Sequence, residues 1–215
     1  MNRLTIVKWL ELVRFELVYQ LSRKSTWLVF AVFLLLLSGE TNGQVLEALE
    51  SEILFHAPLF IAESSIGMGL IALLVMAPVA GNAATRDMET RIEPLMHAAP
   101  IRRIAYLGGR FFGAFSLSAL LLLAIPLALI VARFVHPSLT PALAGPFRLL
   151  AFLQTYFLLI LPNAFVAVAV MFTLSVVMRH TLGSYLGGAA VLMGTLVSTQ
   201  VIAQAQGRWK LATLL

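Results

Sequence analysis

Residues that could carry acid–base, nucleophilic or metal chemistry are few and scattered in this chain. The four histidines lie near the ends of apolar runs, no H-E-x-x-H motif occurs, and there is no cysteine. An intramembrane enzyme needs acids, bases or metal ligands that converge at membrane depth. Ser116, Ser118 and Ser175 have no histidine nearby in sequence, and hydroxyls bonded to their own helix backbone explain them more simply. We therefore expect no catalytic residue and no metal site, and keep an intramembrane enzyme as an alternative.

A different kind of chemistry, recognition of another protein, is indicated between residues 85 and 110. Charged residues are concentrated there, and Ile92, Leu95 and Met96 share one face at helical spacing. Pro100 ends that short helix, and a second helix is expected to begin near Arg102. Such a segment could press an apolar surface against a partner while its charges fix the orientation. The alternative is a solvated turn that joins two spans.

Amide side chains inside apolar runs form the remaining set of candidates. They could line a substrate path, because lipid-facing amides are costly, or they could bridge helices. These residues are Asn82, Gln154, Asn163 and Gln200.

The elements that must position these residues follow from composition. The chain has 215 residues, 60% of them apolar and 12% charged, with a mean hydropathy of +0.93. Soluble domains carry roughly a quarter charged residues, so a soluble globule is excluded, and disorder is excluded by the same apolar content. The net charge of +5 does not indicate nucleic acid, because the charges sit between long apolar runs. The class that remains is an integral membrane protein.

Five apolar runs are candidates for membrane spans, since a span needs about 20 mostly apolar residues. The first is short and could be a signal-peptide core, but the acidic segment before it favours a retained span. The fourth is long enough to need a break, which we expect at Pro162 and Asn163, and the fifth carries Gly183, Gly187, Gly188 and Gly194 as a helix-packing face. The runs are residues 26–38, 66–84, 111–132, 149–178 and 182–203.

Basic residues set the orientation, because Lys and Arg are retained on the cytoplasmic side. Eleven fall on the side of the N-terminus and the 85–110 loop, and four on the other side. We therefore expect a cytoplasmic N-terminus and an external loop over residues 39–65. The fold class is an all-α, polytopic transmembrane bundle with an N-terminal segment at 1–24 and a transmembrane domain at 25–215.

The N-terminal segment has the pattern of an amphipathic interfacial helix. A helix packed on the rest of its own protein is the alternative, and the spacing does not separate the two. The apolar side holds Ile6, Trp9, Leu10, Val13 and Leu17, and the polar side holds Arg3, Lys8, Glu11 and Arg14.

The chain resembles the ABC-2 type permeases, the membrane subunits of ATP-binding-cassette transporters. The resemblance rests on Arg86-Asp87-x-Glu89 directly after a span, then an apolar patch, then Pro100-Ile101-x-Arg103 and the run Tyr106-Leu107-Gly108-Gly109-Arg110. The order of an amphipathic helix, a span, a loop, and two spans joined by this segment also agrees. In that family the corresponding loop contacts the ATPase subunit.

The resemblance implies a permease that forms the translocation path and is driven by a separate ATPase, with export as the direction and the plasma (inner) membrane as the location. No G-x-x-x-x-G-K-[ST] occurs in the chain, so ATP and magnesium are expected on the partner and no cofactor in this chain. The expected partners are the ATPase, a second permease half and the bilayer, with no nucleic acid. The implied coupling residues are Asp87, Glu89, Ile92, Glu93, Leu95, Met96 and Arg103.

The number of spans departs from the family, whose half-transporters usually have six. Five are found here, so we expect a fragment or a truncated product of a longer permease, and a complete five-span protein is the alternative. A membrane anchor for an appended domain, without transport activity, is a further alternative to transport.

Overall fold

The computed structural model describes residues 3–51, 55, 57–89, 103–135 and 146–212. Within these ranges the chain forms helices joined by short turns, and no strand is found there. The all-α fold class is confirmed. The helices are α1 (Arg3–Ser22), α2 (Lys24–Ser51), α3 (Pro58–Glu89), α5 (Arg103–Leu122), α6 (Ala124–Val135), α8 (Leu149–Thr155), the π-helical turn η1 (Tyr156–Ile160), α9 (Leu161–Met178) and α10 (Leu182–Ala212).

Five helical stretches are long and apolar enough to cross a membrane. They coincide with the five predicted runs, and the chain is a multi-pass membrane protein. The first three begin before the predicted runs, and the first two also end after them. The stretches are Lys24–Glu47, Pro58–Glu89, Ile104–Ala132, Leu149–Met178 and Leu182–Val201.

The external loop expected over residues 39–65 is wrong for most of its length. Helix α2 continues to Ser51, and α3 begins at Pro58, a residue that suits the first turn of a helix. Two polar side chains of this segment pair along the helix: the Gln44 amide donates to the Glu40 carboxylate at 3.4 Å, one turn earlier. Polar residues do not end a helix when they can pair at this spacing.

Two long apolar stretches are interrupted just before a proline. The third is divided at Leu123, ahead of Pro126, and the fourth contains the π-helical turn η1 directly ahead of Pro162. A proline ring clashes with the carbonyl four residues earlier, and a local change of helical pitch relieves the clash. The break expected at Pro162 therefore lies a few residues upstream, and α9 continues through the proline to Met178.

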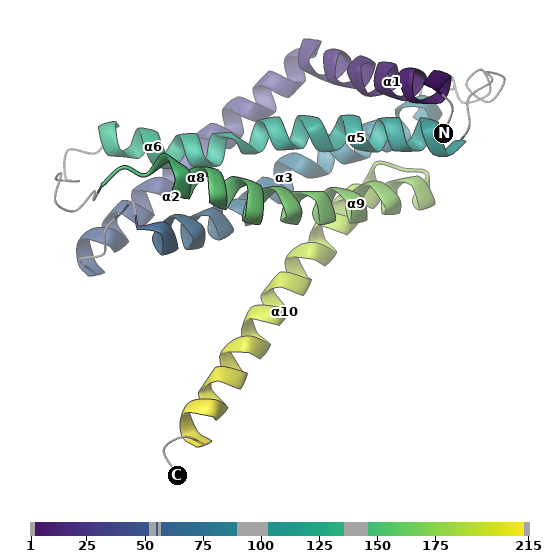
Figure 1. Ribbon diagram of the computed structural model, residues 1–215. Helices are drawn as coiled ribbons and strands as arrows, with labels where there is room; N and C mark the ends of the chain where they lie inside the picture. The colour runs from purple at the N-terminus through teal and green to yellow at the C-terminus, as the bar shows by residue number, and fades with distance from the viewer. Residues whose placement is uncertain (1–2, 52–54, 56, 90–102, 136–145, 213–215) are drawn as a thin grey trace.

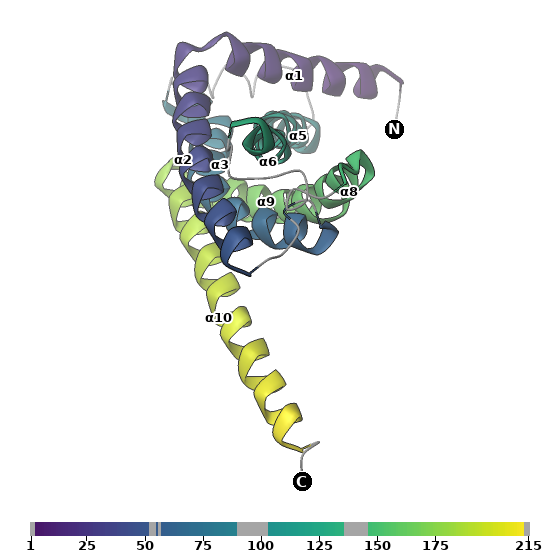
Figure 2. The same ribbon diagram turned by 90° about the vertical axis from the view of Figure 1, so that its left-hand side faces the viewer.

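The helices form a bundle from which one helix diverges. In both views α1 lies across the outside of α5, and the C-terminal half of α10 extends away from the other helices (Figures 1 and 2). The core is apolar and fully buried at Phe33, Met68, Leu117, Ile125 and Met171.

Glycines hold α10 against α9 near their turn, as the glycine pattern predicted for three of four positions. A Cβ atom at Gly183 would lie 2.6 Å from the carbonyl of Leu174, and one at Gly187 would lie 2.8 Å from the Met171 Cα. Gly188 is also close to Met171, whereas Gly194 has nothing within 4 Å. The packing face therefore ends before Gly194, where α10 leaves the bundle.

We expect opposite effects from the same substitution at two of these glycines. Gly183→Ala should lower the free energy of unfolding by about 1–3 kcal/mol, because the added methyl overlaps backbone that can move only by separating the helices. Gly194→Ala should raise it by up to about 1 kcal/mol, since alanine favours the helix and the space is open. Thermal unfolding in detergent, followed by circular dichroism, measures both, and equal effects would contradict this packing.

Candidate functional site

Charged side chains from three helices meet at one end of the bundle. They come from the middle of α1, the last turn of α3 and the first turns of α5. Helices α3 and α5 are the ones that flank residues 90–102 in the sequence. We call this group the ionic cluster; its members are Glu16, Arg86, Asp87, Tyr106 and Arg110.

The link between α1 and α3 is a two-pronged ion pair. The Arg86 guanidinium donates to both oxygens of Glu16, at 2.8 and 3.2 Å. Gln20, one turn later on α1, donates to the same carboxylate at 3.2 Å. The Arg86 guanidinium also stacks over the Tyr19 ring, 4.0 Å from its centre. Paired hydrogen bonds of this kind fix orientation as well as distance, so α1 is held in one rotation relative to α3.

The link between α3 and α5 is centred on Asp87. Its carboxylate forms an ion pair with Arg110 and accepts a hydrogen bond from the Tyr106 hydroxyl. Arg110 also donates to the backbone carbonyl of Ala83 at 2.9 Å. Its guanidinium lies 4.0 Å from the Glu16 carboxylate. The two acids and two arginines therefore form one connected, charge-balanced group.

These charges are nearly removed from solvent. Side-chain exposure is 2% for Glu16, 7% for Arg110, 11% for Arg86 and 13% for Asp87. Removing one partner of a buried ion pair leaves an uncompensated charge and costs about 3–5 kcal/mol. The cluster therefore requires α1, α3 and α5 to stay in register with one another.

Small residues on α5 make room for this arrangement. Gly109 and Gly113 face α1 with three residues between them, the spacing that lets two helix backbones approach. A Cβ atom at Gly109 would lie 2.9 Å from the Leu12 Cβ, and one at Gly113 would lie 2.6 Å from the Glu16 Cβ. The same two glycines therefore bring Glu16 within reach of the arginines.

A second group of polar side chains joins the end of α3 to the turn between α9 and α10. The Thr85 and Thr181 hydroxyl oxygens are 2.9 Å apart, and both hydroxyls are within hydrogen-bonding distance of the Glu89 carboxylate. Close approach is again permitted by a glycine, because a Cβ atom at Gly81 would lie 2.7 Å from the Thr181 side chain. We call Thr85, Glu89 and Thr181 the threonine–glutamate network.

The predicted coupling residues are thus divided between two sites. Asp87 belongs to the ionic cluster, whereas Glu89, two residues later, belongs to the threonine–glutamate network. Both stand on the last turn of α3 rather than in a loop, so the expected start of the loop at residue 85 is wrong. Arg103 begins α5. Four of the predicted residues lie outside the described part of the chain: Ile92, Glu93, Leu95 and Met96.

The four amides predicted inside the spans have different environments. Asn82 accepts a hydrogen bond from Arg23 at 3.3 Å and so joins α3 to the turn between α1 and α2. Asn163 lines a cavity between helices. Gln154 and Gln200 are exposed on the outer surface of the chain. Asn82 fits the helix-bridging alternative, and Asn163 is the one of the four that faces a large cavity.

Glu16 is the functional residue that sequence reasoning missed. It lies among the α1 positions that pack on the protein, on the same helical face as Val13 and Gln20. An acid on the packed face of a helix needs a buried partner, and this signal was present in the sequence. The predicted division of α1 into faces holds only in part, because Leu10, expected on the apolar side, is half exposed.

Two serines also differ from expectation. Ser118 and Ser175 are fully buried, and their hydroxyl oxygens have no hydrogen-bond partner within the described ranges. The expected bond to their own helix backbone is therefore wrong for both. Over the same ranges, no three His, Cys, Asp or Glu side chains are grouped so that they could hold a metal ion.

The chain matches no protein-family model, no curated protein and no solved structure. Its function is therefore argued from the residues and their geometry.

We expect Glu16→Ala to destabilise the protein by about 3–5 kcal/mol, because it leaves Arg86 and Arg110 buried beside a single acid. Glu11→Ala, on the exposed side of the same helix, is the matched control and should change stability by less than about 0.5 kcal/mol. Thermal unfolding in detergent measures both. If the two variants unfold alike, the ion pairs do not hold α1 in place.

Proposed function

We propose that this chain is the permease component of an ATP-binding-cassette transporter, located in the plasma (inner) membrane and acting in export. In this proposal it forms half of a translocation path with a second permease half. ATP and magnesium bind to a separate ATPase subunit. The proposal rests on the ABC-2 resemblance over residues 86–110 and on the geometry at the two ends of that segment.

One observation carries the proposal: the helix ends on either side of residues 90–102 are fixed to each other and to α1 by the ionic cluster. Asp87 precedes the segment, Tyr106 and Arg110 follow it, and all three are directly linked. A force applied to the segment would therefore move three helices together instead of being absorbed by a flexible joint. That is the mechanical property needed where an ATPase drives a membrane subunit.

Helix α3 provides the route from this end of the bundle into the membrane. It is 32 residues long, about 48 Å at the helical rise. Its last turn contributes to both the ionic cluster and the threonine–glutamate network, so it is tied to α1, to α5 and to the turn that precedes α10. A shift of the α3 end would be transmitted to the opposite end of the same helix.

The absence of cysteine from the sequence allows a direct test with single reactive thiols. Leu95→Cys lies in the proposed contact segment, and Ser138→Cys, between α6 and α8, is the matched control in the opposite connection. In intact cells we expect an impermeant maleimide to label position 138 and not position 95. Labelling of position 95 from outside would place the contact segment in the wrong compartment and overturn the proposal.

The same pair of variants tests the partner. A maleimide–diazirine crosslinker at position 95 should capture a protein that contains G-x-x-x-x-G-K-[ST] and hydrolyses ATP, and the crosslinker at position 138 should not. Capture of such an ATPase from position 138 alone, or from neither position in the organism's own membranes, would contradict the proposed coupling.

We further expect Glu89→Lys to reduce transport-coupled ATPase activity by about tenfold while the chain still inserts in the membrane. Lysine cannot accept the hydrogen bonds from Thr85 and Thr181. Because Glu89 is exposed to solvent, we take about 1.5 kcal/mol, the lower end for hydrogen bonds to a charged group, which corresponds to roughly tenfold. Glu50→Lys, an exposed acid on α2, is the control for the charge change. An unchanged coupled rate in reconstituted vesicles, with normal amounts of inserted protein, would exclude Glu89 from the coupling.

A further inference from the structure

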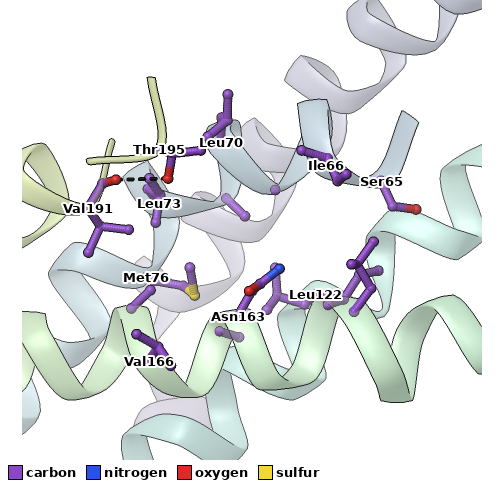
Figure 3. A pocket seen from close by; sticks show the side chains of 16 residues that line it. Ser65, Ile66, Leu70, Leu73, Met76, Leu122, Asn163, Val166, Val191 and Thr195 are labelled. Atoms are coloured by element: carbon purple, nitrogen blue, oxygen red, sulfur yellow. Dashed lines mark hydrogen bonds between the residues drawn. The ribbon is translucent and has the colours of Figure 1, made fainter. Parts of the chain in front are cut away.

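A cavity of about 290 Å³ lies between α3, η1, α9 and α10, with Leu122 of α5 at its margin (Figure 3). Its wall is mostly aliphatic and includes Leu73, Met76 and Val191. The lining contains no Asp, Glu, Lys, Arg or His. The volume is roughly twice that of an engineered apolar cavity of about 150 Å³ that stays dry and binds benzene. A molecule of about twice that size, without charge, fits this space.

Two of the three polar side chains in the wall are already satisfied. The Ser65 hydroxyl donates to the Ile61 carbonyl at 2.7 Å, and the Thr195 hydroxyl donates to the Val191 carbonyl at 2.9 Å. Neither hydroxyl therefore needs a further acceptor. These two residues contribute little to recognition beyond the shape of the wall.

The third polar side chain, Asn163, is not satisfied. Its amide points into the cavity between Met76 and Leu122 (Figure 3), and it makes no hydrogen bond to any residue that the structure describes. Asn163 is exposed on the chain, but it lies near the midpoint of the Leu149–Met178 span, where the surrounding lipid offers no hydrogen-bond partner and an unpaired amide costs several kcal/mol. A bound molecule with one hydroxyl or carbonyl group would pair with it.

The backbone around the cavity leaves room for such a molecule. Gly69 lines the cavity, and a Cβ atom built there would have nothing within 4 Å. Ile160, from the π-helical turn η1, also lies in the wall, and π turns are frequent at functional sites. The cavity therefore has free space beside Gly69 of α3, and the widened helical turn η1 contributes to its wall.

We propose that this cavity is a binding site for an uncharged, mainly aliphatic molecule with one hydroxyl or carbonyl group, which Asn163 recognises by hydrogen bonding. The statement that such molecules are substrates rests on the proposed transport function, whereas the existence of the binding site does not depend on that function. The binding experiment below uses the purified full chain without an ATPase. Its failure would leave the coupling proposal standing, and a failure of coupling would leave this binding site standing.

The test uses a photoreactive decanol that carries a diazirine, with the chain reconstituted in phosphatidylcholine vesicles. We expect mass spectrometry to locate the label on cavity-lining segments of α3 and α9. Gly69→Leu should reduce this labelling by about tenfold, because the new side chain fills the space. Gly43→Leu, an exposed α2 position with equally open surroundings, should leave it unchanged. Val191→Phe narrows the cavity from α10 and replaces Gly69→Leu if that variant does not fold.

The polar part of the proposal is tested by competition. Decanol should displace the label about fivefold better than decane, the size expected for one neutral hydrogen bond. In Asn163→Leu, which keeps the volume and removes the amide, this preference should disappear. Labelling that persists in both cavity-filling variants would overturn the site, since it would reflect partition into lipid. Equal competition by decane and decanol in the unmodified chain would overturn the role of Asn163.

Discussion

The arrangement of α1, α3 and α5 depends on the pairing of four buried charges. Glu16 and Asp87 face Arg86 and Arg110 with little access to solvent. Loss of a partner by any of these groups costs several kcal/mol of folding free energy, because an unpaired charge in a low-dielectric site has nothing to replace its lost hydration. The tolerance for sliding or rotating any of the three helices is therefore small. Apolar packing alone would not impose this restriction, since lipid and neighbouring helices are equally apolar.

This constraint turns one end of the bundle into a rigid unit, and the glycines determine its dimensions. Gly109 and Gly113 allow α1 to approach α5, while Gly81 allows α10 to approach α3. Polar groups then lock each approach: ion pairs in the first case and threonine hydroxyls with Glu89 in the second. Small residues and charged residues thus act together, because neither could position the helices without the other.

Much of the fold could be predicted from the sequence, because apolar runs of sufficient length identify spans without any tertiary information. The helix ends could not. The polar residues of 39–65 predict a loop, but pairing such as that of Gln44 with Glu40 is compatible with the continuation of α2 to Ser51. Only part of the site could be predicted from the sequence. Asp87 and Glu89 belong to a recognisable motif. Glu16 and Thr181 are distant in sequence and reach the site only through helix packing.

One hydrogen bond connects the two helices near their interruptions. The Tyr156 hydroxyl, in η1, donates to the Ala119 carbonyl of α5 at 2.7 Å, a few residues before the break at Leu123. The α5–α6 stretch and the α8–η1–α9 stretch are thus each interrupted, and this hydrogen bond joins them. Helix α5 is fixed at its start by the ion pair of Arg110 with Asp87, whereas α6 and α8, beyond the breaks, do not contribute to the ionic cluster. Bending of these two helices is expected at their breaks, where the regular helical hydrogen bonds are interrupted, and the Tyr156–Ala119 hydrogen bond would link the two movements.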